Sequence, residues 1–118
     1  MYISLLRSKI HRAVVTSIDI SYEGSITVDM DLLDKAGIYL HEKVLIADVE
    51  NGARFETYVI PGGRSTGTIQ INGAAGRLVS IGDHIIIMAF AHVEDPPPNN
   101  WQPKVISLNE DNTVSIPS

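Results

Sequence analysis

The sequence predicts a mostly β protein that folds as a closed barrel with one or two short helices. Short segments of alternating apolar and polar residues, typical of half-buried strands, recur along the chain with turn residues between them. Residues 84–91 form a near-continuous apolar run, which predicts a strand covered on both faces. The 118 residues suit one compact core, and no linker or repeat divides them. We therefore expect a single domain over residues 1–118.

The strand patterns follow one another closely along the chain. Strands are expected at residues 2–6, 12–20, 26–29, 44–49, 55–60, 68–72 and 84–91, and a last hairpin at 105–108 and 114–116. The pair Asn51-Gly52 favours a tight hairpin turn between two of these strands. The consecutive prolines within residues 95–100 exclude regular structure there. This many short strands in one domain is typical of a barrel.

One helical segment interrupts the strands. Asp29 or Asp31 is suited to cap a short helix over residues 32–36, because aspartate side chains accept hydrogen bonds from free N–H groups at a helix start. Gly37 is the expected C-terminal stop. Both predictions depend on side-chain chemistry rather than on hydrophobic pattern.

Composition excludes several classes of function. The formal net charge is −5 and no basic run is present, which argues against nucleic-acid binding. The chain has no cysteine, and its four histidines lack the spacing of metal ligands, so neither thiolate chemistry nor a metal is expected. No segment approaches 18 apolar residues and the start lacks a signal-like core. We expect a soluble cytoplasmic protein that does not bind membranes.

The stretch from Tyr22 to Asp29 carries the most distinctive chemistry. A Gly24-Ser25 bond lies at the head of an alternating strand in which Ile26 and Val28 share one face. Glycine permits a strained backbone, and the Ser25 hydroxyl is placed to attack the carbonyl carbon of Gly24. A Gly-Ser pair is common by chance, so its neighbours decide its meaning.

Four further motifs accompany this bond in order along the chain. They are Lys9-Ile10-His11-Arg12, Asn51-Gly52 with Arg54-Phe55, Thr57-Tyr58, and Asn72-Gly73-Ala74-Ala75. Together with residues 22–29 they resemble the aspartate 1-decarboxylase family, in register from about residue 3 to residue 93. The resemblance implies a six-stranded double-psi β-barrel and a homotetramer with sites at subunit interfaces. It also implies decarboxylation of L-aspartate to β-alanine and CO2, feeding pantothenate biosynthesis.

The resemblance assigns the cofactor to the chain itself. Ser25 is the implied self-cleavage nucleophile, which becomes a covalently bound pyruvoyl group and forms the Schiff base with substrate. Cleavage between Gly24 and Ser25 divides the chain into residues 1–24 and residues 25–118. No glycine-rich phosphate loop opens a helix, which argues against pyridoxal phosphate. Whether maturation uses a helper protein stays open at this point.

The other motif residues receive roles by the same resemblance. Thr57 stabilises the oxyanion of self-cleavage and contacts substrate, and Tyr58 donates the proton to the carbanion. The planar fork of Arg54, with Lys9 beside it, suits the second carboxylate of aspartate. The remaining expected pocket residues are Asn72, Gly73, Ala74 and Ala75, with His11 and Tyr22 behind them.

Thr57 and Tyr58 are adjacent on a strand, so their side chains should point to opposite faces of the sheet. The two residues can serve one site only if a twist or bulge redirects one of them, or if the two faces border different subunits. Taken singly, each motif residue also fits an ordinary structural role, and only the joint spacing favours a site.

The sequence departs from the family pattern at two places. Ser21 stands where many members have histidine, and the prolines at 96–98 replace a segment that forms a short helix in relatives.

Two alternative functions stay open beside this interpretation. One alternative is a pyruvoyl decarboxylase for another amino acid, against which the paired cations Arg54 and Lys9 argue. The other is a non-catalytic double-psi barrel that binds a partner, which predicts a chain that never cleaves.

Overall fold

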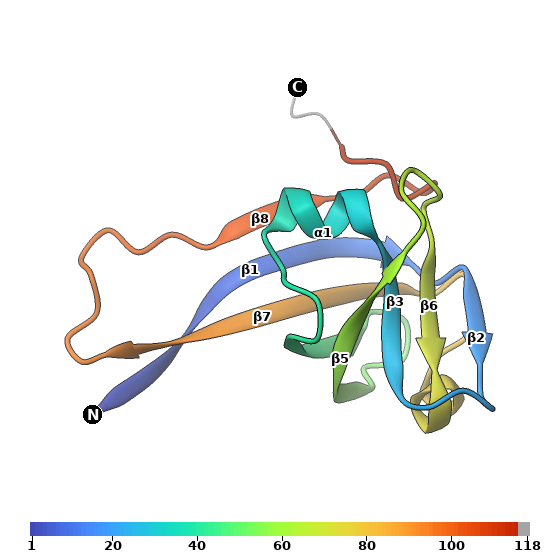
Figure 1. The fold of residues 1–118 in the computed structure, drawn as a ribbon, viewed down its shortest axis with the longest axis horizontal. Coiled ribbons are helices and arrows are strands. Elements are labelled where there is room, and N and C mark those ends of the chain that lie inside the picture. Colours follow the sequence, from blue (N-terminus) through green and yellow to red (C-terminus); the bar gives the residue numbers. More distant parts are fainter. Residues whose placement is uncertain (116–118) are drawn as a thin grey trace.

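The computed structural model describes residues 1–115 and is mostly β, with two short helices, as predicted. Figure 1 shows the arrangement of these elements. The strands are β1 (Tyr2–Val14), β2 (Ser17–Asp19), β3 (Ser25–Asp29), β4 (Lys43–Asp48), β5 (Arg54–Gly62), β6 (Ile69–Asn72), β7 (His84–Glu94) and β8 (Lys104–Ser107). The helices are α1 (Met30–Ala36) and the 3₁₀ helix η1 (Gly73–Leu78). Within residues 1–115, neither helix has the length and apolar character needed to cross a membrane.

The strands form one mixed sheet in the order β2-β6-β3-β5-β4-β7-β1-β8. Strand β3 is parallel to β5 and antiparallel to β6, so β3 lies between two segments that follow it far along the chain. The sheet has eight strands rather than the six that the resemblance implies. Two of the eight, β2 and β8, are short strands of three and four residues that lie at the two ends of the order.

The N-terminal strand differs from its prediction. Residues 2–6 and 12–20 were expected as separate strands, but β1 runs without a break from Tyr2 to Val14 and β2 is only a short continuation. The pairing of β1 with β7 shifts register between Leu6 and Ser8 and again between Ile10 and Ala13. Bulges of this kind interrupt the apolar alternation without ending a strand, which explains the apparent gap in the pattern.

Helix α1 has the predicted caps. Asp29 is the N-cap, and its Oδ1 accepts a hydrogen bond from the Asp31 N–H at 2.9 Å. Gly37 is the C-cap with a φ of 71°, a left-handed conformation that glycine adopts without strain. Asp29 also accepts from the backbone N–H groups of Ser65 and Gly67, which fastens the 63–67 loop beside the helix. One buried carboxylate thus connects β3, α1 and this loop.

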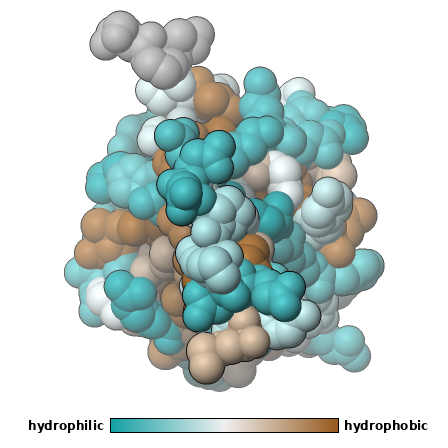
Figure 2. Space-filling model, turned by 90° about the vertical axis from the view of Figure 1, so that its left-hand side faces the viewer, coloured by the Kyte–Doolittle hydropathy of each residue, from teal (hydrophilic) through white to brown (hydrophobic). Residues whose placement is uncertain are grey.

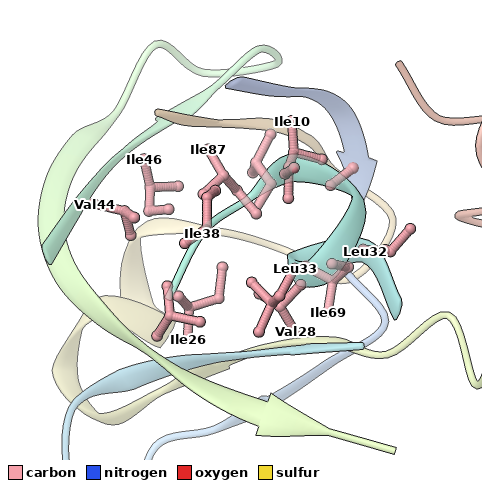
Figure 3. Packing of buried hydrophobic residues seen from close by; sticks show 14 of the residues in the cluster. Ile10, Ile26, Val28, Leu32, Leu33, Ile38, Val44, Ile46, Ile69 and Ile87 are labelled. Carbon is pink, nitrogen blue, oxygen red and sulfur yellow. The ribbon is translucent and has the colours of Figure 1, made fainter. Parts of the chain in front are cut away.

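The core lies inside the curved sheet, and branched aliphatic side chains from most strands meet there (Figure 3). Ile26 and Val28 of β3 are fully buried, as are Ile71 of β6 and Val59 of β5. The prediction that residues 84–91 are covered on both faces is wrong within one chain. Burial along β7 alternates, with Ile85, Ile87 and Ala89 buried while Phe90 is 41% exposed.

The C-terminal part is irregular around its prolines, as predicted. Residues 95–103 contain no strand or helix, and β8 then pairs parallel to β1. The predicted last hairpin is reduced to a bridge between Leu108 and Val114, with the Ser115 N–H donating to the Ser107 carbonyl. Residue 116, the expected end of this hairpin, lies outside the described residues.

Candidate active site

Ser25 begins β3 and is buried, with 1% of its surface exposed. It pairs with Asn72, the last residue of the antiparallel strand β6. The Asn72 side chain donates from Nδ2 to Ser25 Oγ at 2.9 Å and to Thr27 Oγ1 at the same distance. The predicted nucleophile therefore has a fixed amide donor on its oxygen.

Polar residues that sequence reasoning missed extend this contact. Gln70 Nε2 donates to Asn72 Oδ1 at 2.7 Å, and Ser17 Oγ donates to Gln70 Oε1 at 2.7 Å. Thr27 follows Ser25 by two residues and Gln70 precedes Asn72 by two. Since side chains two apart on a strand share a face, this period was the available signal for both.

The Gly24 peptide is approached closely by Gly73, the first residue of η1. A Cβ on Gly73 would lie 2.9 Å from both Cα and N of Gly24 and 3.1 Å from the Tyr22 carbonyl oxygen. Gly73 also has a φ of 77°, which other residues rarely adopt. In Figure 1 the start of β3 and the end of β6 lie at the same lower edge, next to η1. The structure thus brings Gly24, Tyr22 and Gly73 together.

The other two residues of the small motif differ in their surroundings. Ala74 is exposed, whereas Ala75 is partly buried and packs against the hydrophobic core. Both belong to η1, which follows directly from Asn72. Ala74 is therefore the more exposed of the two within one chain.

Strand β5 places Tyr58 level with Ser25. Ile26 pairs with Val59 in parallel register, so the residues before them, Ser25 and Tyr58, also lie beside each other. Tyr58 is 39% exposed, and by strand alternation it shares a face with Arg54 while Thr57 points the other way. The pairing of β5 with β4 runs in unbroken register from Arg54 to Tyr58, so no bulge redirects Thr57.

Lys9 and His11 are not brought to Ser25 within one chain by the sheet. They lie on β1, and β4 and β7 separate that strand from β5 in the sheet order. Lys9 pairs with Met88 and Val105 instead. Partial burial, with the charges of Lys9 and Arg12, lowers the pKa of His11 below its usual value. Its Nδ1 is buried and has no hydrogen-bond partner among residues 1–115.

A second polar cluster lies where the β4–β5 turn meets the start of β7. The carboxylates of Asp48, Glu50 and Asp83 lie within 4.8 Å of one another. Both Glu50 oxygens face His84, one at its Nδ1 and one accepting from its backbone N–H. Asp48 is buried, and this burial together with neighbouring Asp83 raises its pKa from 3.8 to about 6. At neutral pH the Asp48 carboxylate is therefore ionised in a buried position beside Asp83, which lowers the stability of the fold.

Replacing Asp48 with asparagine is expected to stabilise the fold above pH 6. The raised pKa means that the folded state holds a proton more tightly than the unfolded state, so this carboxyl contributes stability below about pH 4 that is lost as pH rises through 6. Asp48→Asn should increase the free energy of unfolding at pH 8 by about 1–3 kcal/mol, with little difference near pH 4. Urea unfolding at both pH values measures this. Glu94→Gln, which removes an exposed charge, is the matched control, and equal stability at pH 8 would contradict the expectation.

Known proteins resemble this chain over nearly all of its length. The family model described as aspartate decarboxylase matches residues 1–115. An aspartate 1-decarboxylase from Clostridium botulinum (strain Alaska E43 / Type E3) is 54% identical, with 97% of this chain and 92% of the relative covered. Those from Carboxydothermus hydrogenoformans and Leptospira biflexa are 49% and 52% identical, covering 97% and 95% of this chain and 90% and 96% of the relatives. The chain belongs to the aspartate decarboxylase family.

Proposed function

We propose that this enzyme cleaves itself between Gly24 and Ser25 and then decarboxylates L-aspartate to β-alanine and CO2. The observation that carries the proposal is the buried Ser25 hydroxyl, which directly follows a glycine and has an amide donor on its oxygen. The proposed product supplies pantothenate biosynthesis, and the proposed location is the cytoplasm.

The self-cleavage proceeds in steps that use only the chain and water. Ser25 Oγ attacks the Gly24 carbonyl carbon, the amide C–N bond breaks, and the hydroxyl proton is transferred to the departing nitrogen. The resulting ester undergoes β-elimination, in which the α-proton of residue 25 is removed and the Gly24 carboxylate leaves. The dehydroalanine that remains takes up water and releases ammonia, leaving a pyruvoyl group at residue 25. Donors near the Gly24 carbonyl stabilise the oxyanion of the first step, and we assign this role to Thr57.

The site residues fit such a group because the new terminus would lie beside Asn72 and level with Tyr58. A pyruvoyl group supplies the ketone that withdraws electrons as the α-carboxylate leaves. Tyr58 would return a proton to the substrate α-carbon. Arg54, on the same face of β5, would bind the second carboxylate of aspartate in its planar fork. Asn72, Gly73 and Ala74 would border the substrate.

Denaturing mass spectrometry of the purified protein tests this proposal. After prolonged warming, we expect two species that correspond to residues 1–24 and residues 25–118, the larger one carrying a carbonyl in place of its N-terminal amine. Treatment with borohydride should add two hydrogens to that species only. A single intact chain that still releases CO2 from aspartate would contradict self-cleavage as the source of activity.

A homotetramer with shared sites is the second part of the proposal. Lys9 lies on β1, away from Ser25 in the sheet order, and β5 has no bulge that would turn Thr57 toward Tyr58. Figure 2 shows the left-hand side of the molecule in Figure 1, where brown hydrophobic patches lie among hydrophilic residues. The exposed side chains of Tyr2 and Phe90 belong to β1 and β7, which extend together to that side of the molecule (Figure 1). Apolar surface of this kind favours contact with further copies.

Mixing two inactive variants tests whether sites are shared. Ser25→Ala lacks the nucleophile and should be inactive. Lys9→Ala lacks the proposed second cation and should need much more aspartate, so at low aspartate each variant alone should be almost inactive. Co-expressed, they should regain activity, because a Ser25 from one chain meets a Lys9 from another at some interfaces. Light scattering on the wild-type protein should report four chains per particle. An active monomer, or a mixture without recovered activity, would contradict shared sites.

A further inference from the structure

A row of polar side chains crosses three neighbouring strands beside Ser25. Ser17 on β2 pairs with Gln70 on β6, and two residues further along β6 Asn72 pairs with Ser25 on β3. Because residues two apart on a strand share a face, Gln70 and Asn72 lie next to each other on the face opposite the core. Gln70 thus stands between Ser17 and the amide that contacts the nucleophile.

Hydrogen bonds along this row have a direction, since an amide side chain has one donor end and one acceptor end. Gln70 uses Oε1 to accept from Ser17 and Nε2 to donate to Asn72 Oδ1, both at 2.7 Å. Asn72 is left with Nδ2 facing Ser25 Oγ. Turning Asn72 over would set its Nδ2 against Gln70 Nε2, two donors in contact. As long as Gln70 presents Nε2, Asn72 presents a donor to Ser25.

This direction matters for attack by the hydroxyl. Ser25 Oγ accepts the Asn72 bond, so its own proton stays free to leave, and the amide N–H faces the oxygen as that oxygen becomes negative. With the reversed orientation, Asn72 Oδ1 would instead hold the Ser25 proton and repel the developing charge. The two orientations of one amide therefore differ in whether they promote or oppose cleavage.

We propose that Gln70 is a positioning residue for self-cleavage, which holds the Asn72 amide in the orientation that donates to the Ser25 hydroxyl. The inference rests on the proposed function, in which Ser25 attacks the Gly24 carbonyl. Among residues 1–115, the Gln70 side chain hydrogen-bonds to Ser17 and Asn72 and not to Ser25 or Gly24, so it acts through Asn72. The titratable residue that pairs with Asn72 from β2 is Asp19, and its carboxylate is engaged by the Ser21 N–H and hydroxyl.

Replacing Gln70 with glutamate reverses the end that faces Asn72. An ionised carboxylate only accepts, so it should draw Asn72 Nδ2 toward itself and turn Oδ1 to Ser25. We expect Gln70→Glu to cleave about tenfold or more slowly than wild type at pH 7.5, equivalent to one misplaced hydrogen bond. As pH is lowered to about 4.5, the carboxyl gains a proton and a donor, so the ratio of the two rates should return toward one.

Mass spectrometry of cleavage against time, on both proteins at each pH, gives this ratio. Gln102→Glu adds the same charge in the exposed segment before β8 and should cleave at the wild-type rate throughout. Gln70→Met keeps the length of the side chain but has no donor, and it should be slowed at every pH. It also serves where the glutamate variant fails to fold, which circular dichroism reports.

The outcomes separate the two hypotheses. A slowed Gln70→Glu whose ratio to wild type does not change with pH would make Gln70 a merely structural residue and overturn the proposal. Cleavage of both Gln70 variants at the wild-type rate would overturn it as well, with self-cleavage intact. A wild-type chain that never cleaves would overturn self-cleavage itself, and the role of Gln70 with it.

Discussion

Ser25→Ala is expected to leave the chain intact and without decarboxylase activity. The substitution removes the proposed nucleophile and, with it, the source of the pyruvoyl group, so no residual route to the cofactor remains. The fold should survive, because Asn72 Nδ2 keeps its hydrogen bond to Thr27 when Ser25 Oγ is lost. We expect a stability loss of about 1 kcal/mol. Mass spectrometry for cleavage, with release of CO2 from aspartate for activity, measures both effects on one preparation.

Ser8→Ala is the matched control for this variant. Ser8 is also a fully buried strand serine, and its hydroxyl donates to the Ala36 carbonyl at 2.6 Å, far from Gly24 in the sheet order. Its loss should lower stability by about 1–3 kcal/mol and still permit cleavage. The assignment of Ser25 fails if Ser25→Ala cleaves at the same bond, or if its intact chain decarboxylates aspartate at the wild-type rate.

The elements that depend on local chemistry were the most predictable from the sequence. Of the two predicted N-caps it is Asp29 that begins α1, Gly37 ends the helix as expected, and Asn51-Gly52 placed the β4–β5 turn. The errors fell where distant partners decide the outcome. Bulges keep β1 continuous through its broken pattern. One face of β7 is only partly covered among residues 1–115, although residues 85–91 are all apolar.

The candidate site likewise contains residues that the sequence predicted and residues that only long-range strand pairing reveals. Ser25 and Asn72, which the resemblance assigned to one site, pair between β3 and β6. Gln70 and Ser17 join them only through the register of β6 with β2 and β3. Pairing between strands 47 or 53 residues apart is not encoded in any local pattern. The converse holds for Lys9, whose motif suggested a place near Ser25 that the sheet order does not provide within one chain.

Cleavage and turnover are expected to separate at two adjacent residues of β5. Thr57→Val keeps the shape of the side chain and removes the hydroxyl proposed to stabilise the oxyanion. Loss of one such donor slows a reaction by about 10²–10³, so uncleaved chain should accumulate. Tyr58→Phe keeps the ring and removes the proposed proton donor, so it should cleave normally and then turn over about 10²–10⁴ more slowly. A gel for cleavage and an assay of β-alanine release, on the same preparations, measure the two steps.

The fold should tolerate both the Thr57 and the Tyr58 substitution, and Arg54 offers a third variant for the same comparison. Tyr58 is 39% exposed and Thr57 half-buried, so neither conservative change opens a large cavity. Arg54 shares the face of Tyr58, and Arg54→Ala should cleave at the wild-type rate but require much more aspartate, because the second carboxylate loses its fork. A Tyr58→Phe chain that stays whole beside a Thr57→Val chain that matures normally would reverse the two roles. Arg54→Ala with unchanged dependence on aspartate concentration would instead assign the carboxylate to another cation, and Lys9 from a neighbouring copy would be the first to test.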